Sequence, residues 1–98
     1  MHPGAASDIT GIGEFIEEDS LRAAGRVRKD ILDAIRKLVP FPYQGYQRTD
    51  ITSRPLCFWT THKSLIAYAP DEMPPLVIAV LHGRRNPRVI EAILRGRQ

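Results

Sequence analysis

The sequence predicts a single α+β domain in which two N-terminal helices pack on a small antiparallel sheet. Two patterns lead to this fold class. Residues 21–38 place their apolar side chains on one helical face, and residues 76–81 are six consecutive apolar residues, which is typical of a strand buried on both faces. The helical patterns precede the strand patterns, as is typical of α+β domains. A chain of 98 residues suffices for one modest core, so we expect one domain over residues 1–98.

A helical hairpin forms the N-terminal part of this prediction. Isoleucines recur at helical spacing within residues 8–18, which indicates a first helix. Asp19 or Ser20 can cap the second helix, and Pro40 helps to set its end. A connection of about three residues forces the two helices to run antiparallel. We therefore expect a hairpin at about residues 8–39, packed on one face of the sheet.

The C-terminal part predicts a three-stranded antiparallel meander within about residues 48–82, followed by a short helix at about residues 87–95. Short turns join three apolar runs, at residues 56–61, 65–69 and 76–81. We expect the last run to be the central strand, because a half-exposed strand would alternate apolar and polar residues. Asn86 can then cap the helix. The opposite face of the sheet and the edge carrying Arg84 and Arg85 are expected to be open.

Charge is distributed unevenly along the chain. Residues 1–35 hold four basic and seven acidic side chains, a net charge of −3, whereas residues 36–98 hold ten basic and four acidic side chains, a net charge of +6. This asymmetry favours a polyanionic or acidic partner for the C-terminal half.

Several classes of protein are disfavoured by composition and spacing. No apolar run approaches the roughly 20 residues that span a bilayer, and the N-terminus lacks the pattern of a signal peptide, so we expect a cytoplasmic protein. The single cysteine, Cys57, agrees with a reducing compartment and is expected to be a buried, inert thiol. His2, His62 and His82 have no cysteine or carboxylate neighbours at ligand spacing, so we expect no metal. No glycine-rich phosphate loop indicates a cofactor.

Short motifs follow one another through nearly the whole chain. They are Pro3-x-Ala5-x-x-Asp8-Ile9-x-x-Ile12, Phe15-Ile16, Ala23-Ala24, Gly45-x-x-Arg48-x-Asp50, Leu65-Ile66-x-Tyr68 and the run from Val80 to Asn86. Their order and spacing resemble the RelE/ParE superfamily, the toxins of bacterial type II toxin–antitoxin pairs, often labelled plasmid stabilisation proteins. The resemblance implies a growth-inhibiting toxin in a hetero-oligomer with a cognate antitoxin that wraps it and neutralises its basic surface.

The sequence departs from the superfamily pattern at its start. Members usually begin with a strand before the Pro-x-Ala motif, and Met1 and His2 leave no room for it. Either the chain starts inside the natural gene or the sheet lacks a strand. The second case would expose a sheet edge, which is a known route to pairing with another chain.

A second departure concerns the target. RelE-like members cleave ribosome-bound mRNA with basic side chains on the central strands and commonly a tyrosine near the C-terminus. Here the run at residues 56–61 carries Cys57, Phe58 and Trp59 instead, and no tyrosine follows Tyr68. ParE-like members lack that catalytic set and poison DNA gyrase. The resemblance therefore leans towards gyrase, while a ribosome-dependent mRNA endoribonuclease with an incomplete catalytic set is the other reading.

Cleavage of RNA by its 2′-hydroxyl needs a base, an acid and cations that stabilise the developing charge. Six side chains could supply these groups or bind the target: His82, Arg84, Arg85, Arg54, Lys63 and Arg48. Arg84 and Arg85 are the pair whose loss we expect to harm activity most, because a strand end positions them and arginine is always charged. Alternatively, His82 has only a structural role, and Arg84 and Arg85 lie in a solvated turn without a specific function. A non-toxic nucleic-acid-binding module or a decayed toxin would also fit the sequence.

Overall fold

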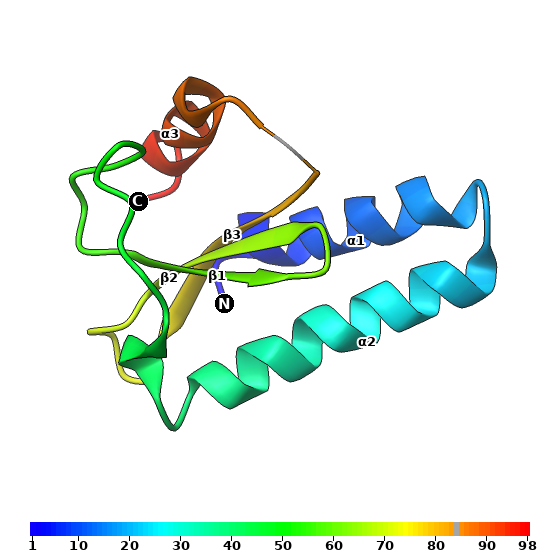
Figure 1. Ribbon diagram of the computed structural model, residues 1–98, viewed down its shortest axis with the longest axis horizontal. Coiled ribbons are helices and arrows are strands. Elements are labelled where there is room, and N and C mark those ends of the chain that lie inside the picture. Colours follow the sequence, from blue (N-terminus) through cyan, green and yellow to red (C-terminus); the bar gives the residue numbers. More distant parts are fainter. Residues whose placement is uncertain (84) are drawn as a thin grey trace.

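The computed structural model describes residues 1–83 and 85–98 and has the predicted α+β architecture (Figure 1). Its elements, in chain order, are α1 (Pro3–Glu17), α2 (Leu21–Leu38), the short 3₁₀ helix η1 (Pro42–Gln44), β1 (Cys57–Thr61), β2 (Ser64–Ala69), β3 (Leu76–His82) and α3 (Pro87–Arg95). The three strands form one antiparallel sheet in the order β1-β2-β3. No helix in these two ranges is long and apolar enough to cross a membrane.

The helical hairpin is confirmed, but α1 begins at Pro3 rather than near residue 8. Proline suits the first helical position, because its φ is already helical and its missing N–H would have no partner there. The His2 ring caps the helix, since its Nδ1 accepts from the Gly4 N–H at 2.9 Å. Ser20 caps α2 as predicted and accepts from the Ala23 N–H at 3.1 Å. The hairpin therefore spans residues 3–38.

The prediction that residues 76–81 form the central strand is wrong. The central strand is β2, and β3 lies at one edge of the sheet. Five consecutive residues of β3 are nevertheless buried, because helices cover both of its faces. One face contributes Val77 and Val80 to a core shared with α1 and α2, and the other contributes Ile78 and Leu81 to a core shared with α3. An unbroken apolar run therefore indicates that both faces of a strand are buried, but it does not indicate how many strands lie beside it.

The second face of the sheet is also not open, contrary to expectation. Ile90 and Leu94 of α3 pack there with Ile51 and Leu56 of the preceding loop. Figure 1 shows α3 and this loop on the side of the sheet away from α2. The sheet itself starts at Cys57 rather than near residue 48, because residues 48–56 form turns that place apolar side chains in this core.

Cys57 is buried at the start of β1, with 6% of its surface exposed, as the sequence indicates. Burial raises the pKa of the thiol above its ordinary value, so less of the reactive thiolate is present at any pH near neutrality. We expect iodoacetamide at pH 8 to alkylate Cys57 on the order of a hundredfold more slowly in the native protein than in urea. Mass spectrometry of timed samples measures this ratio. Similar alkylation rates in both states would contradict the burial of Cys57 in β1.

Candidate functional site

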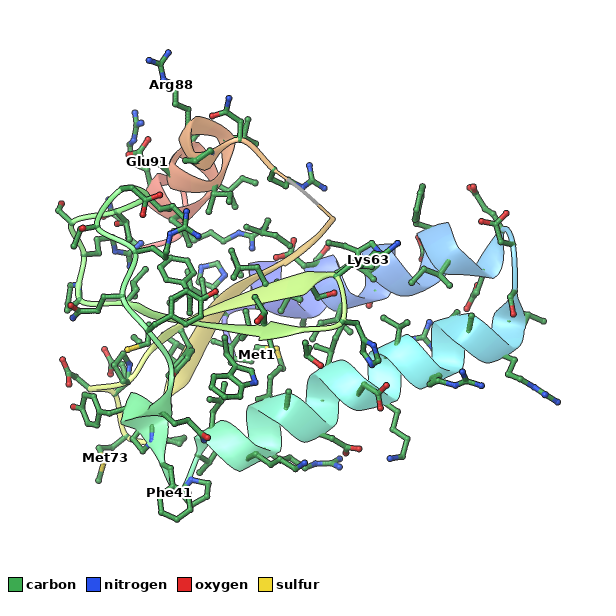
Figure 2. The ribbon with its side chains drawn as sticks, in the orientation of Figure 1. Met1, Phe41, Lys63, Met73, Arg88 and Glu91 are labelled. Carbon is green, nitrogen blue, oxygen red and sulfur yellow. The ribbon has the colours of Figure 1, made fainter. Side chains whose placement is uncertain are left out.

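The end of β3 and the turn between β1 and β2 lie together at one end of the sheet. The Gly83 N–H donates to the Lys63 C=O at 2.7 Å, which ties the two segments directly. Gly83 has a φ of +80°, a conformation that glycine adopts without strain, and it turns the chain out of the sheet after His82. Lys63 stands at the tip of the β1–β2 turn (Figure 2). The fold thus brings two predicted site residues, Lys63 and His82, to the same end.

His82 is held by a residue that the sequence analysis does not single out. The Ser64 hydroxyl lies 3.0 Å from the His82 Nδ1, and Ser64 is 1% exposed. The two residues are direct cross-strand partners in the register of β2 and β3. Because Nδ1 is engaged, the ring orientation is fixed and Nε2 is the nitrogen left to meet a ligand or a proton. Counting residues back from the β2–β3 turn would pair Ser64 with Leu81 instead, because the register shifts by one residue between Ala67 and Tyr68, so the sequence carries no signal for this pair.

A groove of about 420 Å³ opens beside the end of β3. Its walls come from three elements, with Ser7, Asp8, Gly11, Ile12 and Phe15 from α1, Val80, Leu81 and His82 from β3, and Ile93 from α3, together with Arg85. Phe15 is 63% exposed, and Arg85 is also exposed and forms no ion pair with any residue the structure describes. The groove therefore combines an apolar wall with a basic mouth.

A second hollow of about 560 Å³ lies at the β1–β2 turn and is lined by Thr60, His62, Lys63, Ser64, Leu65 and Gly83. His62 adopts a positive φ of 53° in the turn, and its Nε2 contacts the Asp30 carboxylate of α2. This contact fastens the turn to the helical hairpin. Lys63, in the same turn, therefore lies on a segment that is fastened to α2.

Two other predicted site residues lie away from this end. The Arg54 guanidinium donates to the C=O groups of Leu94 and Arg97 at 2.7 and 3.0 Å, so it caps the end of α3. Arg48 makes a bidentate contact with Asp50, which raises the pKa of Arg48 and lowers the pKa of Asp50. Their role in binding a target stays a prediction, as does that of Arg84, which lies outside the described residues.

The gathered groups suit an anionic ligand. Lys63 and Arg85 form no ion pair with any residue the structure describes, whereas Asp8, the carboxylate in the lining of the first groove, is paired with Arg97. Exposed cations of this kind bind phosphate or carboxylate groups. Within residues 1–83 and 85–98, no group of three histidine, cysteine or acidic side chains is arranged to hold a metal ion.

Comparison with known proteins gives one finding. Residues 1–87 match the family model described as ParE toxin of type II toxin-antitoxin system, parDE. No curated protein matches the sequence closely enough to count as a relative. The matched range includes both helices of the hairpin, the whole sheet and the groove residues up to Arg85.

Proposed function

The chain belongs to the ParE toxin family of type II toxin–antitoxin systems, and from this premise we propose that it arrests bacterial growth by poisoning DNA gyrase. It acts in the cytoplasm and is neutralised by a cognate ParD antitoxin, with which it forms a hetero-oligomer. The observation that carries the proposal is the match over residues 1–87, which covers every element that builds the end of the sheet.

The placement of the basic residues supports gyrase over mRNA as the target. A ribonuclease site needs several cations around one phosphate. Arg54 instead bonds two backbone carbonyls at the end of α3, and Arg48 is paired with Asp50. β1 carries Cys57 and Phe58, both buried, in place of the basic strand side chains expected of a RelE-like ribonuclease. The groove beside the end of β3, with its exposed Phe15 and Arg85, is therefore better suited to binding a protein than to cleaving RNA.

Induced expression in bacteria tests the proposal. Growth is followed while chromosomal DNA and RNA ends are sampled soon after induction, and the purified chain is mixed with gyrase and supercoiled plasmid. Arrest with gyrase-linked DNA breaks and intact transcripts is the expected result. Cut transcripts with intact DNA would overturn it in favour of mRNA cleavage. Salt-dependent nucleic-acid binding without arrest would indicate a non-toxic binding module, and no activity of either kind a decayed toxin.

Arg85 is the described residue that we expect to contribute most to toxicity. Arg85→Ala removes an exposed cation from the groove mouth and should raise the concentration needed for gyrase poisoning about tenfold, with unchanged stability. Arg88→Ala is the matched control, because Arg88 also follows β3 and is exposed but points from α3 into solvent (Figure 2). Equal toxicity of both variants and the parent would exclude the groove mouth from target binding.

A further inference from the structure

All the exposed charged residues of α2 are basic. At 3.6 residues per turn their side chains fall within a sector about 100° wide, and at 1.5 Å per residue the sector is about 22 Å long. A sum of charges over residues 1–35 conceals this pattern, because most of the acidic residues in that range lie on α1 and in the turn before α2. We call the set the α2 stripe: Arg22, Arg26, Lys29, Arg36 and Lys37.

The α2 stripe faces solvent because the opposite face of the helix is buried. The buried residues of α2 are Ala24, Ile31 and Leu38, which lie about half a turn away from the stripe. Figure 1 shows α2 as the outermost element on the side of the molecule opposite α3. No residue of α2 lines the groove beside β3. The stripe is therefore an accessible surface separate from that groove.

Carboxylates neutralise only part of the stripe. Asp33 pairs with Lys29 at 2.7 Å and with Arg36 at 3.1 Å. Asp30, the other acidic residue of α2, contacts His62 instead. The remaining three stripe residues form no ion pair with any residue that the structure describes. The stripe thus keeps an excess of positive charge along one face.

This arrangement lowers the stability of its own helix. The first turn of α2 has no acidic residue and places Arg22 at the positive end of the helix dipole. Arg26 follows one turn later, and like charges at this spacing repel. Glu18 and Asp19 in the preceding turn offset the repulsion only at the Arg22 end. Because solvated helix faces usually alternate the sign of their charges, a face of one sign indicates a polyanionic ligand.

The composition of the stripe indicates which polyanion it fits. α2 contains no aromatic residue, so the bases of a single-stranded nucleic acid would have no ring to stack on. A protein partner would need an apolar centre in the interface, and the one exposed apolar side chain of α2, Leu21, lies outside the sector. The buried apolar face of α2 cannot enter a membrane. Phosphates of a duplex are the ligand that remains.

The dimensions of α2 favour duplex DNA over duplex RNA. An α-helix with its side chains is about 10–12 Å across, and the major groove of DNA is about 12 Å wide. Arg36 and Lys37 lie at the two edges of the sector, from which they can reach phosphates on opposite walls of the groove. The major groove of duplex RNA is too narrow and deep to admit the helix.

We propose that the α2 stripe binds the phosphate backbone of duplex DNA, with α2 lying along the major groove. Binding is independent of base sequence, because phosphate contacts carry no sequence information. The inference does not rest on the proposed function, since the stripe and the groove beside β3 are separate surfaces. In a gyrase poison, such binding would concentrate the toxin on the DNA that gyrase acts on.

Fluorescence anisotropy with a labelled DNA duplex tests the proposal on the purified full chain. Five cations less one carboxylate correspond to about four phosphate contacts, which predict a slope of about −4 for log K against log[NaCl]. Affinity should therefore fall on the order of a hundredfold between 50 and 200 mM NaCl. Arg22→Gln, Arg26→Gln and Lys37→Gln together remove the three unpaired cations. We expect this triple variant to bind at least about tenfold more weakly, with a slope less steep by about 3.

A second triple variant is the matched control. Lys63→Gln, Arg85→Gln and Arg88→Gln together remove the same charge from three exposed residues at the sheet end and on α3. We expect it to change the affinity for DNA less than about threefold, because these residues lie away from the stripe and salt screens their field. All six residues are exposed, so both variants should keep the circular dichroism spectrum of the wild type. Loss of binding in the control variant alone would overturn the proposal and assign DNA binding to the sheet end.

Parallel titrations distinguish the competing polyanions. They use an RNA duplex of the same sequence, single-stranded DNA, and vesicles with equal amounts of phosphatidylcholine and phosphatidylserine, compared per anionic group. Duplex DNA should bind most tightly. Equal or tighter binding of another ligand that the α2 variant loses would overturn the assignment to duplex DNA. Absence of salt-dependent DNA binding by the wild type would overturn the proposal and keep the proposed function, which growth arrest and gyrase poisoning measure separately.

Discussion

Replacing Gly45 with alanine is expected to lower the free energy of unfolding by about 3 kcal/mol. A Cβ atom there would lie 2.4 Å from the Tyr68 hydroxyl oxygen and 2.8 Å from the Phe58 carbonyl oxygen. Neither oxygen can move away from the added methyl group without breaking a hydrogen bond. Tyr68 is fully buried, and its hydroxyl donates to the Pro42 C=O at 2.7 Å while accepting from the Gly45 N–H at 3.0 Å. The Phe58 carbonyl is fixed by its hydrogen bond from Tyr46.

Urea unfolding followed by the fluorescence of Trp59, the single tryptophan, measures this loss. In a domain of this size it corresponds to a fall in Tm on the order of 15 °C. Gly11→Ala is the control, because its added methyl group meets no atom within 4 Å and alanine favours a helix interior by up to about 1 kcal/mol. The two alanine substitutions should therefore shift stability in opposite directions. A small effect at Gly45 would mean that the loop after η1 moves freely over Tyr68.

The hairpin and α3 could be predicted from the sequence because their signals are local. A 3.6-residue apolar period marks α2, Ser20 caps it, and Asn86 accepts from the Arg88 N–H where α3 begins. The order of the strands could not be predicted, because helices bury β3 as fully as neighbouring strands would. The start of α1 was missed because the isoleucine stripe begins after its first turn, in which Pro3 and His2 are the signals.

The candidate site was predictable only as a set of residue types. The strand end and the glycine predict that Arg84 and Arg85 stand where β3 leaves the core, and Arg85, the one of the two that the structure describes, is exposed there. Some basic side chains bond to other parts of the protein and are not available to a ligand. These bonds join distant segments, as that of Arg54 with the C=O of Leu94 does, so the sequence does not reveal them. Ser64 carries no chemical signal in the sequence, and its role appears only with the register of β2 against β3.

Arg97 is a second residue that local patterns could not identify, because its partner Asp8 lies at the other end of the chain. The Asp8 carboxylate accepts from the Arg97 Nη2 at 2.9 Å and from the Val80 N–H at 2.9 Å. The two side chains are 18% and 19% exposed. Asp8→Ala would leave a partly buried cation without a counter-charge and a backbone amide without an acceptor. We expect a loss of about 3 kcal/mol in the free energy of unfolding, at the low end for a buried pair because of the partial exposure.

A double-mutant cycle measures the interaction free energy of Asp8 with Arg97 separately from the other contributions to this loss. Asp8→Ala, Arg97→Ala and the double variant should give a coupling of about 1–2 kcal/mol that changes little between low salt and 1 M NaCl, because partly buried charges are weakly screened. Arg95→Ala breaks the exposed Glu91–Arg95 pair on α3 and should cost less than about 0.5 kcal/mol. Equal losses for Asp8→Ala and Arg95→Ala would show that the C-terminal segment is not fastened to α1.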